Sequence, residues 1–109
     1  EEAELLVKHD SIPTGELIAF DATAGPFDDT LQVPSRSITI EWPKALRLQV
    51  INSHTWFVLY TGDESHLCIE PQTGAPNSID GQFGDSAIAC SRSHPAVMTT
   101  RWEFTPISD

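Results

Sequence analysis

The most constraining feature of this sequence is an alternation of polar and apolar residues with a period of two. In segment 37–42 every second residue is apolar, which places Ile38, Ile40 and Trp42 on one face of a strand. Segment 46–50 alternates in the same way. No stretch long enough for a stable helix has apolar residues at the helical spacing i, i+3, i+4 and i+7. The pattern therefore predicts a protein built from strands.

Other short apolar runs end at turn residues and extend this prediction along the chain. Residues 12–15 (Ile-Pro-Thr-Gly) and 43–45 (Pro-Lys-Ala) indicate turns, and residues 71–86 a long loop. The predicted strands are 5–9, 16–20, 37–42, 46–50, 56–60, 66–70, 87–90 and 96–104. Strands that recur about every 8–12 residues between Pro and Gly are typical of sandwiches and barrels, so we expect an all-β fold.

The charge balance argues against two classes of partner. Six Lys and Arg residues oppose sixteen Asp and Glu residues, which gives a formal charge of −10. Binding to nucleic acid or to an anionic membrane surface requires clustered Lys and Arg, which this sequence lacks. No apolar run approaches the roughly 20 residues of a membrane span, and no signal-peptide core follows Glu1 and Glu2. We expect one acidic domain or a piece of one, with neither nucleic acid nor membrane as partner.

The cysteines and histidines show no metal-site spacing. Cys68 and Cys90 lie outside any Cys-x-x-Cys arrangement and have apolar neighbours, so two buried free thiols are favoured over a disulfide. Free thiols suit a reducing compartment, which indicates a cytoplasmic protein. The histidines have no His or Cys at metal-ligand spacing and are expected in loops or on the surface: His9, His54, His66 and His94. We expect neither a metal nor a cofactor.

The role of Glu70 depends on how far it is buried. Glu70 ends an otherwise apolar strand, between Ile69 and Pro71. If this strand end is desolvated, the pKa of the Glu70 carboxyl rises toward neutrality, which suits a general base. If Glu70 instead faces solvent, it is an ordinary surface acid. The pattern alone favours the second interpretation, since acidic residues are mostly exposed.

Two further groups have competing interpretations. Asp28 and Asp29 follow Gly-Pro-Phe, where paired acids usually form a turn, although as a functional pair they could bind a cation or sugar hydroxyls. The three tryptophans could stack on a sugar. Trp42 and Trp102 lie on the apolar face of alternating strands, so packing in the core is favoured for the tryptophans, Trp56 included.

Four short segments carry a resemblance to a known family. Residues 68–77 (Cys-Ile-Glu-Pro-Gln-Thr-Gly-Ala-Pro-Asn) contain a Glu, a Gln two residues later and a following Pro, as in the C-terminal signature of aldose 1-epimerases. Residues 12–16 resemble a turn typical of that family, residues 27–31 a segment with an acid between apolar residues, and residues 57–62 the strand with a Tyr-Thr pair. The segments occur in the family's order, so the chain resembles aldose 1-epimerases, the galactose mutarotases and their relatives.

The resemblance implies a fold and an activity. The fold would be an antiparallel β-sandwich of the galactose-mutarotase (supersandwich) type, and the activity would be interconversion of the α and β anomers of a hexose. The residue that matches the family's general base is Glu70. The family's sugar-binding Asp matches Asp28, with Asp29 as the alternative, and Gln72 of the signature would also bind the substrate. In this family a histidine protonates the ring oxygen while the base takes the proton of the anomeric hydroxyl.

The resemblance covers only the C-terminal portion of such an enzyme. The family's histidine motifs lie upstream of the segment that matches residues 12–16, and His9 is in no matching motif. The chain also begins at Glu1, without an initiator methionine. We therefore expect residues 1–109 to form a partial sandwich that is inactive alone, with the acid histidine outside this chain. Its uncovered strand edges and apolar face would be covered by a missing N-terminal part of the same protein or by self-association.

Two other functions remain open. The chain could be a non-catalytic carbohydrate-binding or regulatory module that kept the scaffold and lost the acid. It could also be an unrelated β-sandwich interaction domain. Upstream histidine motifs in the parent reading frame would favour catalysis over the first alternative.

Overall fold

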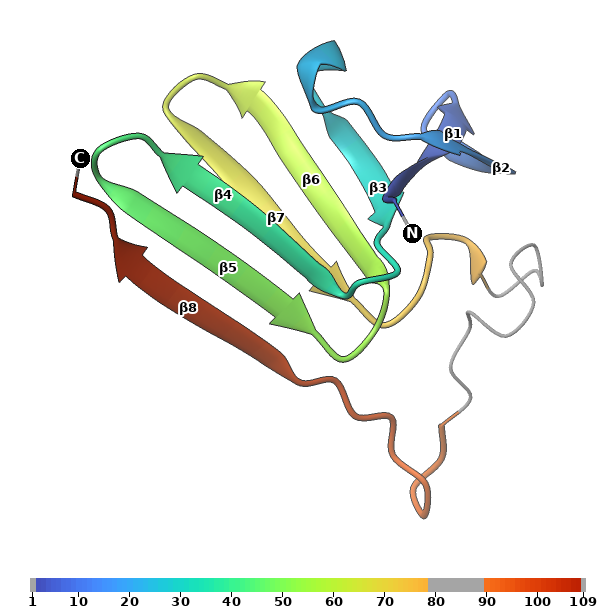
Figure 1. Ribbon diagram of the computed structural model, residues 1–109. Coiled ribbons are helices and arrows are strands. Elements are labelled where there is room, and N and C mark those ends of the chain that lie inside the picture. The colour runs from blue at the N-terminus through green and yellow to red at the C-terminus, as the bar shows by residue number, and fades with distance from the viewer. Residues whose placement is uncertain (1, 79–89, 109) are drawn as a thin grey trace.

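The computed structural model describes residues 2–78 and 90–108 and confirms the all-β prediction (Figure 1). These residues contain eight strands and the short 3-10 helix η1 (Ala22–Ala24). The strands are β1 (Glu4–His9), β2 (Ile12–Ala19), β3 (Asp28–Gln32), β4 (Ser37–Trp42), β5 (Leu46–Asn52), β6 (Trp56–Asp63), β7 (His66–Gln72) and β8 (Thr100–Pro106). No helix within this described part is long and apolar enough to cross a membrane.

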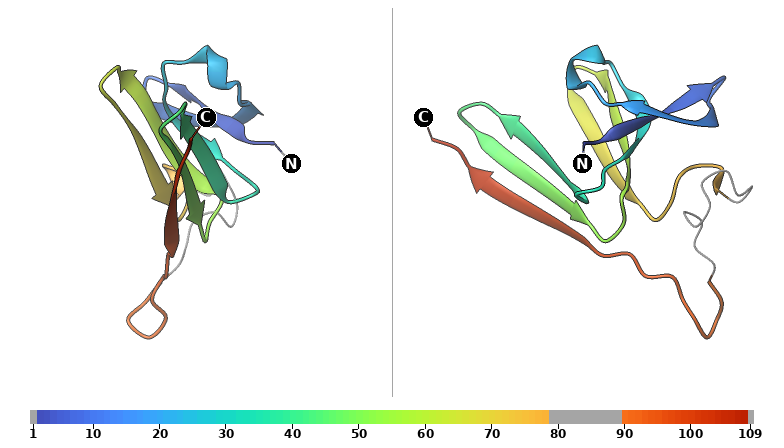
Figure 2. Two further views of the ribbon diagram at one scale, coloured as in Figure 1. Left: turned by 60° about the vertical axis from the view of Figure 1, so that its left-hand side comes forward. Right: turned by 45° about the vertical axis from the view of Figure 1, so that its right-hand side comes forward.

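The strands form two antiparallel sheets in a sandwich-like arrangement. Sheet A has five strands in the order β2-β1-β3-β6-β7, and sheet B has three in the order β4-β5-β8. The two sheets face each other but are not parallel plates. They are close together at one end and diverge toward the other, as the right-hand view of Figure 2 shows.

The core lies between the sheets because both alternating patterns turn their apolar residues inward. Leu31 and Phe57 are register partners on sheet A, and they pack in one cluster with Leu48 and Val50 of sheet B. Phe57 and Val50 have no exposed surface. Burying a side chain of this size contributes roughly 1.5–3 kcal/mol, so this cluster is the main source of stability. The opposite face of sheet B is polar, with an ion pair between the register partners Glu41 and Arg47.

The described connections between the sheets lie at the end where the sheets are close. They are residues 33–36 and 53–55, and the end of β7 at Gln72 and the start of β8 at Thr100 lie at this same end. Hydrogen bonds join Val33 N to Thr55 O at 2.6 Å and Ser53 N to Thr99 O at 2.9 Å. We call this end of the sandwich the crossing end.

A buried amide adds to the closure of the crossing end. Asn52, the last residue of β5, is 2% exposed. Its side-chain nitrogen donates to the carbonyl oxygens of Trp56 at 3.2 Å and Gln72 at 3.1 Å, which belong to sheet A. Asn52 therefore ties the two sheets together in a place where unpaired carbonyl groups would be costly.

The opposite end, which we call the open end, carries the β4–β5 and β6–β7 hairpin tips. Trp42 and Trp102 lie on the face of sheet B that is turned toward sheet A, but their side chains are 41% and 43% exposed. Phe104 is 62% exposed. The prediction of core packing is therefore wrong for Trp42 and Trp102, because the sheets diverge before these rings are covered. It is confirmed for Trp56, which is 4% exposed and packs with Leu6 on the other face of sheet A.

Two predicted strand boundaries are wrong for a shared reason. Residues 12–15 are not a turn but the first half of β2, and the turn lies one step earlier at Asp10 and Ser11, both with positive φ. Likewise, β7 does not stop at Pro71 but continues to Gln72. Both β2 and β7 are edge strands of sheet A, where a proline costs no ladder hydrogen bond if its nitrogen faces outward.

The remaining sequence predictions have mixed outcomes. The last strand begins at Thr100 rather than at residue 96, and most of the predicted strand 87–90 lies outside the described residues. Both cysteines are free, as predicted. Neither is buried, however, because Cys68 is partly exposed on β7 and Cys90 is exposed.

Candidate functional site

The register of sheet A brings the three predicted site residues to one face. Asp28 of β3 pairs with Tyr60 of β6, and Glu70 of β7 pairs with Val58 of the same central strand. Gln72 follows Glu70 by two positions, so it shares the face. Directly paired residues point to the same side, and this side is the one that faces away from sheet B. From strand spacing and rise, the Cα atoms of Asp28 and Glu70 lie roughly 12 Å apart.

A hollow of about 200 Å³ lies on this outer face of sheet A. Its lining residues are Leu6, Lys8, Ser11, Pro13, Asp28, Asp29, Thr30, Val58 and Pro76. Asp28 is thus part of the hollow, and Val58 extends it to the position beside Glu70. Since small-molecule pockets usually measure about 300–1,000 Å³, the hollow is smaller than an ordinary ligand pocket.

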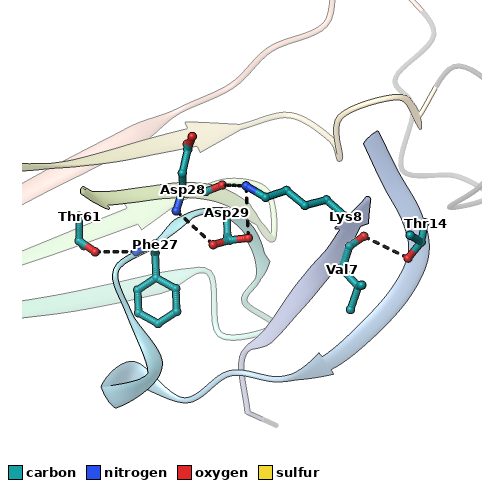
Figure 3. Close-up of polar contacts among 7 residues, drawn as sticks. All are labelled: Val7, Lys8, Thr14, Phe27, Asp28, Asp29 and Thr61. Carbon is teal, nitrogen blue, oxygen red and sulfur yellow. Dashed lines mark hydrogen bonds and ion pairs between the residues drawn. The ribbon is translucent and has the colours of Figure 1, made fainter. Parts of the chain in front are cut away.

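Lys8 contacts the side chain of one neighbouring acid, Asp29, but only the backbone of the other, Asp28 (Figure 3). Its ammonium lies 3.6 Å from Asp29 Oδ1 and also donates to the carbonyl oxygen of Asp28. Asp29 Oδ2 additionally accepts from the Asp28 backbone N–H at 3.1 Å. The Asp28 carboxylate points away from Lys8 and is exposed. The prediction of a turn is wrong here, since both acids belong to β3.

The start of β3 is fixed by paired hydrogen bonds to β6. Phe27 N donates to Thr61 Oγ1 at 2.8 Å, and Thr61 N donates to the Phe27 carbonyl oxygen at 2.8 Å. Next to this pair, Gly62 leaves room for the Tyr60 ring, because a Cβ at Gly62 would lie only 3.0 Å from three of its atoms. Tyr60 is the register partner of Asp28, so these contacts fix the strand pairing beside Asp28.

The desolvation on which the base role of Glu70 was predicted is absent from the described part of the chain. Glu70 is exposed, because β7 is an edge strand and no described element covers its outer face. In the same ranges, residues 2–78 and 90–108, no group of three or more His, Cys, Asp or Glu side chains could hold a metal ion.

A second, larger cavity lies on the other side of sheet A, and no sequence motif predicted it. This inter-sheet cleft measures about 500 Å³ and opens at the open end. Trp42 and Trp102 line one side, and residues 63–66 of the β6–β7 hairpin line the other. An apolar strand face that ends in tryptophans, together with an acidic hairpin, is the only sequence signal that could have indicated it.

The hairpin acid beside this cleft, Asp63, accepts two hydrogen bonds from Ser65. Asp63 Oδ1 accepts from the Ser65 hydroxyl at 2.6 Å and from the Ser65 backbone N–H at 2.7 Å. These hydrogen bonds, the hydroxyl first, lower the pKa of the Asp63 carboxyl below its usual value. The cleft therefore has a carboxylate at its mouth at neutral pH.

No family model, curated protein or solved structure matches this chain.

Proposed function

We propose that this chain is the C-terminal part of an aldose 1-epimerase-like protein that binds a hexose on the outer face of sheet A. The observation that carries the proposal is the register that puts Asp28, Glu70 and Gln72 on one face, beside a hollow that contains Asp28. These are the same residues that match the family's sugar ligand, its base and its signature Gln. We also propose that the protein is cytoplasmic, since its two cysteines are free.

The reaction interconverts two anomers through an open chain. Glu70 removes the proton from the anomeric hydroxyl, the bond from the anomeric carbon to the ring oxygen breaks, and the ring oxygen takes a proton from an acid. Rotation about the bond to the aldehyde carbon and reclosure, with both proton transfers reversed, give the other anomer. The acid is a histidine outside this chain, so residues 1–109 alone supply the base and part of the sugar site. The rest of the protein then covers Glu70 and desolvates it.

The sugar contacts follow from the charges around the hollow. Lys8 neutralises Asp29 and leaves the carboxylate of Asp28 available to accept hydrogen bonds from sugar hydroxyls. The amide of Gln72 can both donate and accept, which suits a hydroxyl. The backbone of Gln72 is fixed by its bond from Asn52, so the side chain projects from a rigid position.

The test is a Glu70→Gln substitution in protein that carries both this chain and the histidine acid. Because general-base catalysis contributes typically 10²–10⁴-fold, we expect mutarotation to slow by about that factor. Exchange between anomers is followed by NMR. The control is Glu16→Gln, which removes an exposed acid from β2. Equal rates in the Glu70→Gln variant and the parent protein would contradict the assignment.

A non-catalytic carbohydrate-binding module is the second candidate. The observation that favours it is the exposure of Glu70, which lacks the apolar surroundings of a base. An NMR titration of the chain with a hexose separates the two. Shifts at Asp28 and Gln72 combined with an unchanged mutarotation rate in the Glu70→Gln protein would establish binding without catalysis.

A further inference from the structure

The inter-sheet cleft is separate from the proposed sugar site. It lies between sheets A and B, whereas Glu70 and Asp28 lie on the outer face of sheet A. Its volume of about 500 Å³ is within the usual range for small-molecule sites, and it is more than twice that of the outer hollow.

The walls of the cleft are apolar and partly aromatic. Six apolar side chains contribute, four from sheet B and two from sheet A: Ile40, Trp42, Leu48, Trp102, Leu67 and Ile69. The depth of the cleft is the buried core, since Leu48 and Ile69 are 7% and 9% exposed. Trp42 and Trp102, at 41% and 43%, form the accessible part. A ligand would therefore bury an apolar or aromatic group against tryptophan.

The charges of the cleft are of one sign. Among its described lining residues, Asp63 and Glu64 are the charged side chains, and neither Lys nor Arg is present. Asp63 accepts two hydrogen bonds from Ser65, and His66, which also lines the cleft, has its Nδ1 3.5 Å from Asp63 Oδ2. Tryptophan faces attract cations as carboxylates do, so the walls and the mouth favour the same sign of ligand charge. An anion would meet repulsion from both.

We propose that the inter-sheet cleft binds a small organic cation that joins an apolar or aromatic group to an ammonium. The apolar group lies between the sheets against Trp42 and Trp102. The ammonium lies at the mouth, near Asp63 and Glu64. The net charge of −10 adds a long-range attraction of the same sign.

The test compares three probes of similar shape that differ in charge: benzyltrimethylammonium, benzyl alcohol and benzoate. Binding is followed by tryptophan fluorescence, with Trp42→Phe and Trp102→Phe variants to separate the cleft signal from that of Trp56. We expect benzyltrimethylammonium to bind at least about tenfold tighter than benzoate. We also expect the preference to weaken as salt rises, because the mouth is exposed to solvent.

Variants that each remove one negative charge from the mouth of the cleft test whether its acids cause the preference for the cation. Glu64→Gln leaves the Asp63–Ser65 turn intact, so a folding defect does not confuse its effect, and Asp63→Asn is the second variant. Each should reduce the preference for the cation several-fold, whereas Glu16→Gln on β2 should not. Backbone amide spectra confirm that each variant is folded.

Three results would overturn the proposal. The first is equal affinity for the cation, the alcohol and the anion. The second is an unchanged preference when both Glu64→Gln and Asp63→Asn are present. The third is a cleft occupied by a second copy of the chain, seen as tryptophan emission that depends on protein concentration when no probe is present.

Discussion

Two phenylalanines show how position decides what one residue contributes. Phe57 on β6 has no exposed surface and lies in the centre of the inter-sheet cluster. Phe104 on β8 faces the same inter-sheet space but is 62% exposed, because it lies where the sheets have diverged. Equal side chains on facing strands therefore differ in how much water they displace on folding.

The difference predicts unequal costs for the same substitution. Phe57→Ala should lower the free energy of unfolding by about 3–5 kcal/mol, the range for a buried phenylalanine with a cavity left behind. Phe104→Ala should cost less than about 1 kcal/mol, since most of its ring is already in water. Urea unfolding curves of both variants give the two values. Similar losses would mean that Phe104 is covered in solution.

At the scale of elements, the β6–β7 hairpin is closed by side-chain hydrogen bonds rather than by a glycine turn. Ser65 donates to Asp63 twice, and Thr23 donates to Asp21 in the same way at η1. In both cases the carboxylate accepts from a residue two positions later, which is the usual way that Asp stabilises a turn. The pKa of each carboxyl is lowered, first by the side-chain hydroxyl and then by the backbone N–H.

The lowered pKa of Asp63 predicts a pH-dependent effect of Ser65→Ala. A carboxyl with a lower pKa in the folded chain adds stability above its unfolded pKa of about 3.9 and loses it as pH falls through the folded value. The variant should therefore melt below the parent at pH 7, and the gap should close toward pH 3. Thermal unfolding at both values measures it. Thr23→Ala, at the matching turn, should follow the same trend, and a gap that is constant with pH would contradict the mechanism.

The whole molecule is less compact than its length requires. Its Cα radius of gyration is 15.2 Å, against roughly 13 Å for a compact chain of this size. The two sheets share a core only near the crossing end. Sixteen acids against six bases add repulsion across this open surface.

Excess charge predicts that salt stabilises the fold. Raising NaCl from about 0.01 M to about 1 M shortens the Debye length from roughly 30 Å to 3 Å, so the melting temperature should rise. The double variant Glu2→Lys and Glu16→Lys changes two exposed acids and takes the net charge from −10 to −10 + 4 = −6. It should melt higher than the parent at low salt and respond less to added NaCl. The same salt response in both proteins would show that the effect is not electrostatic.

Features that depend on neighbouring residues could be predicted from the sequence, whereas features that depend on contacts between distant segments could not. The all-β class was predictable because alternation in segments such as 37–42 is a local signal. The prolines at positions 13 and 71 were misread, since whether a strand tolerates proline depends on its being an edge strand, which only the assembled sheet decides. The shared face of Asp28 and Glu70 also needed the order β3-β6-β7. The exposure of Trp102 depended on the angle between sheets, which no local pattern encodes.

The described connections between sheets A and B lie at the crossing end, so the two sheets are joined along one edge. Within the described chain no covalent connection joins the hairpin tips across the open end, so their separation is restrained only by side-chain packing. The angle between sheets A and B can change without breaking any hydrogen bond between the strands of either sheet. We therefore expect the space between Trp102 and the β6–β7 tip to vary more readily in width than the outer face of sheet A, which is held by the hydrogen bonds between its strands.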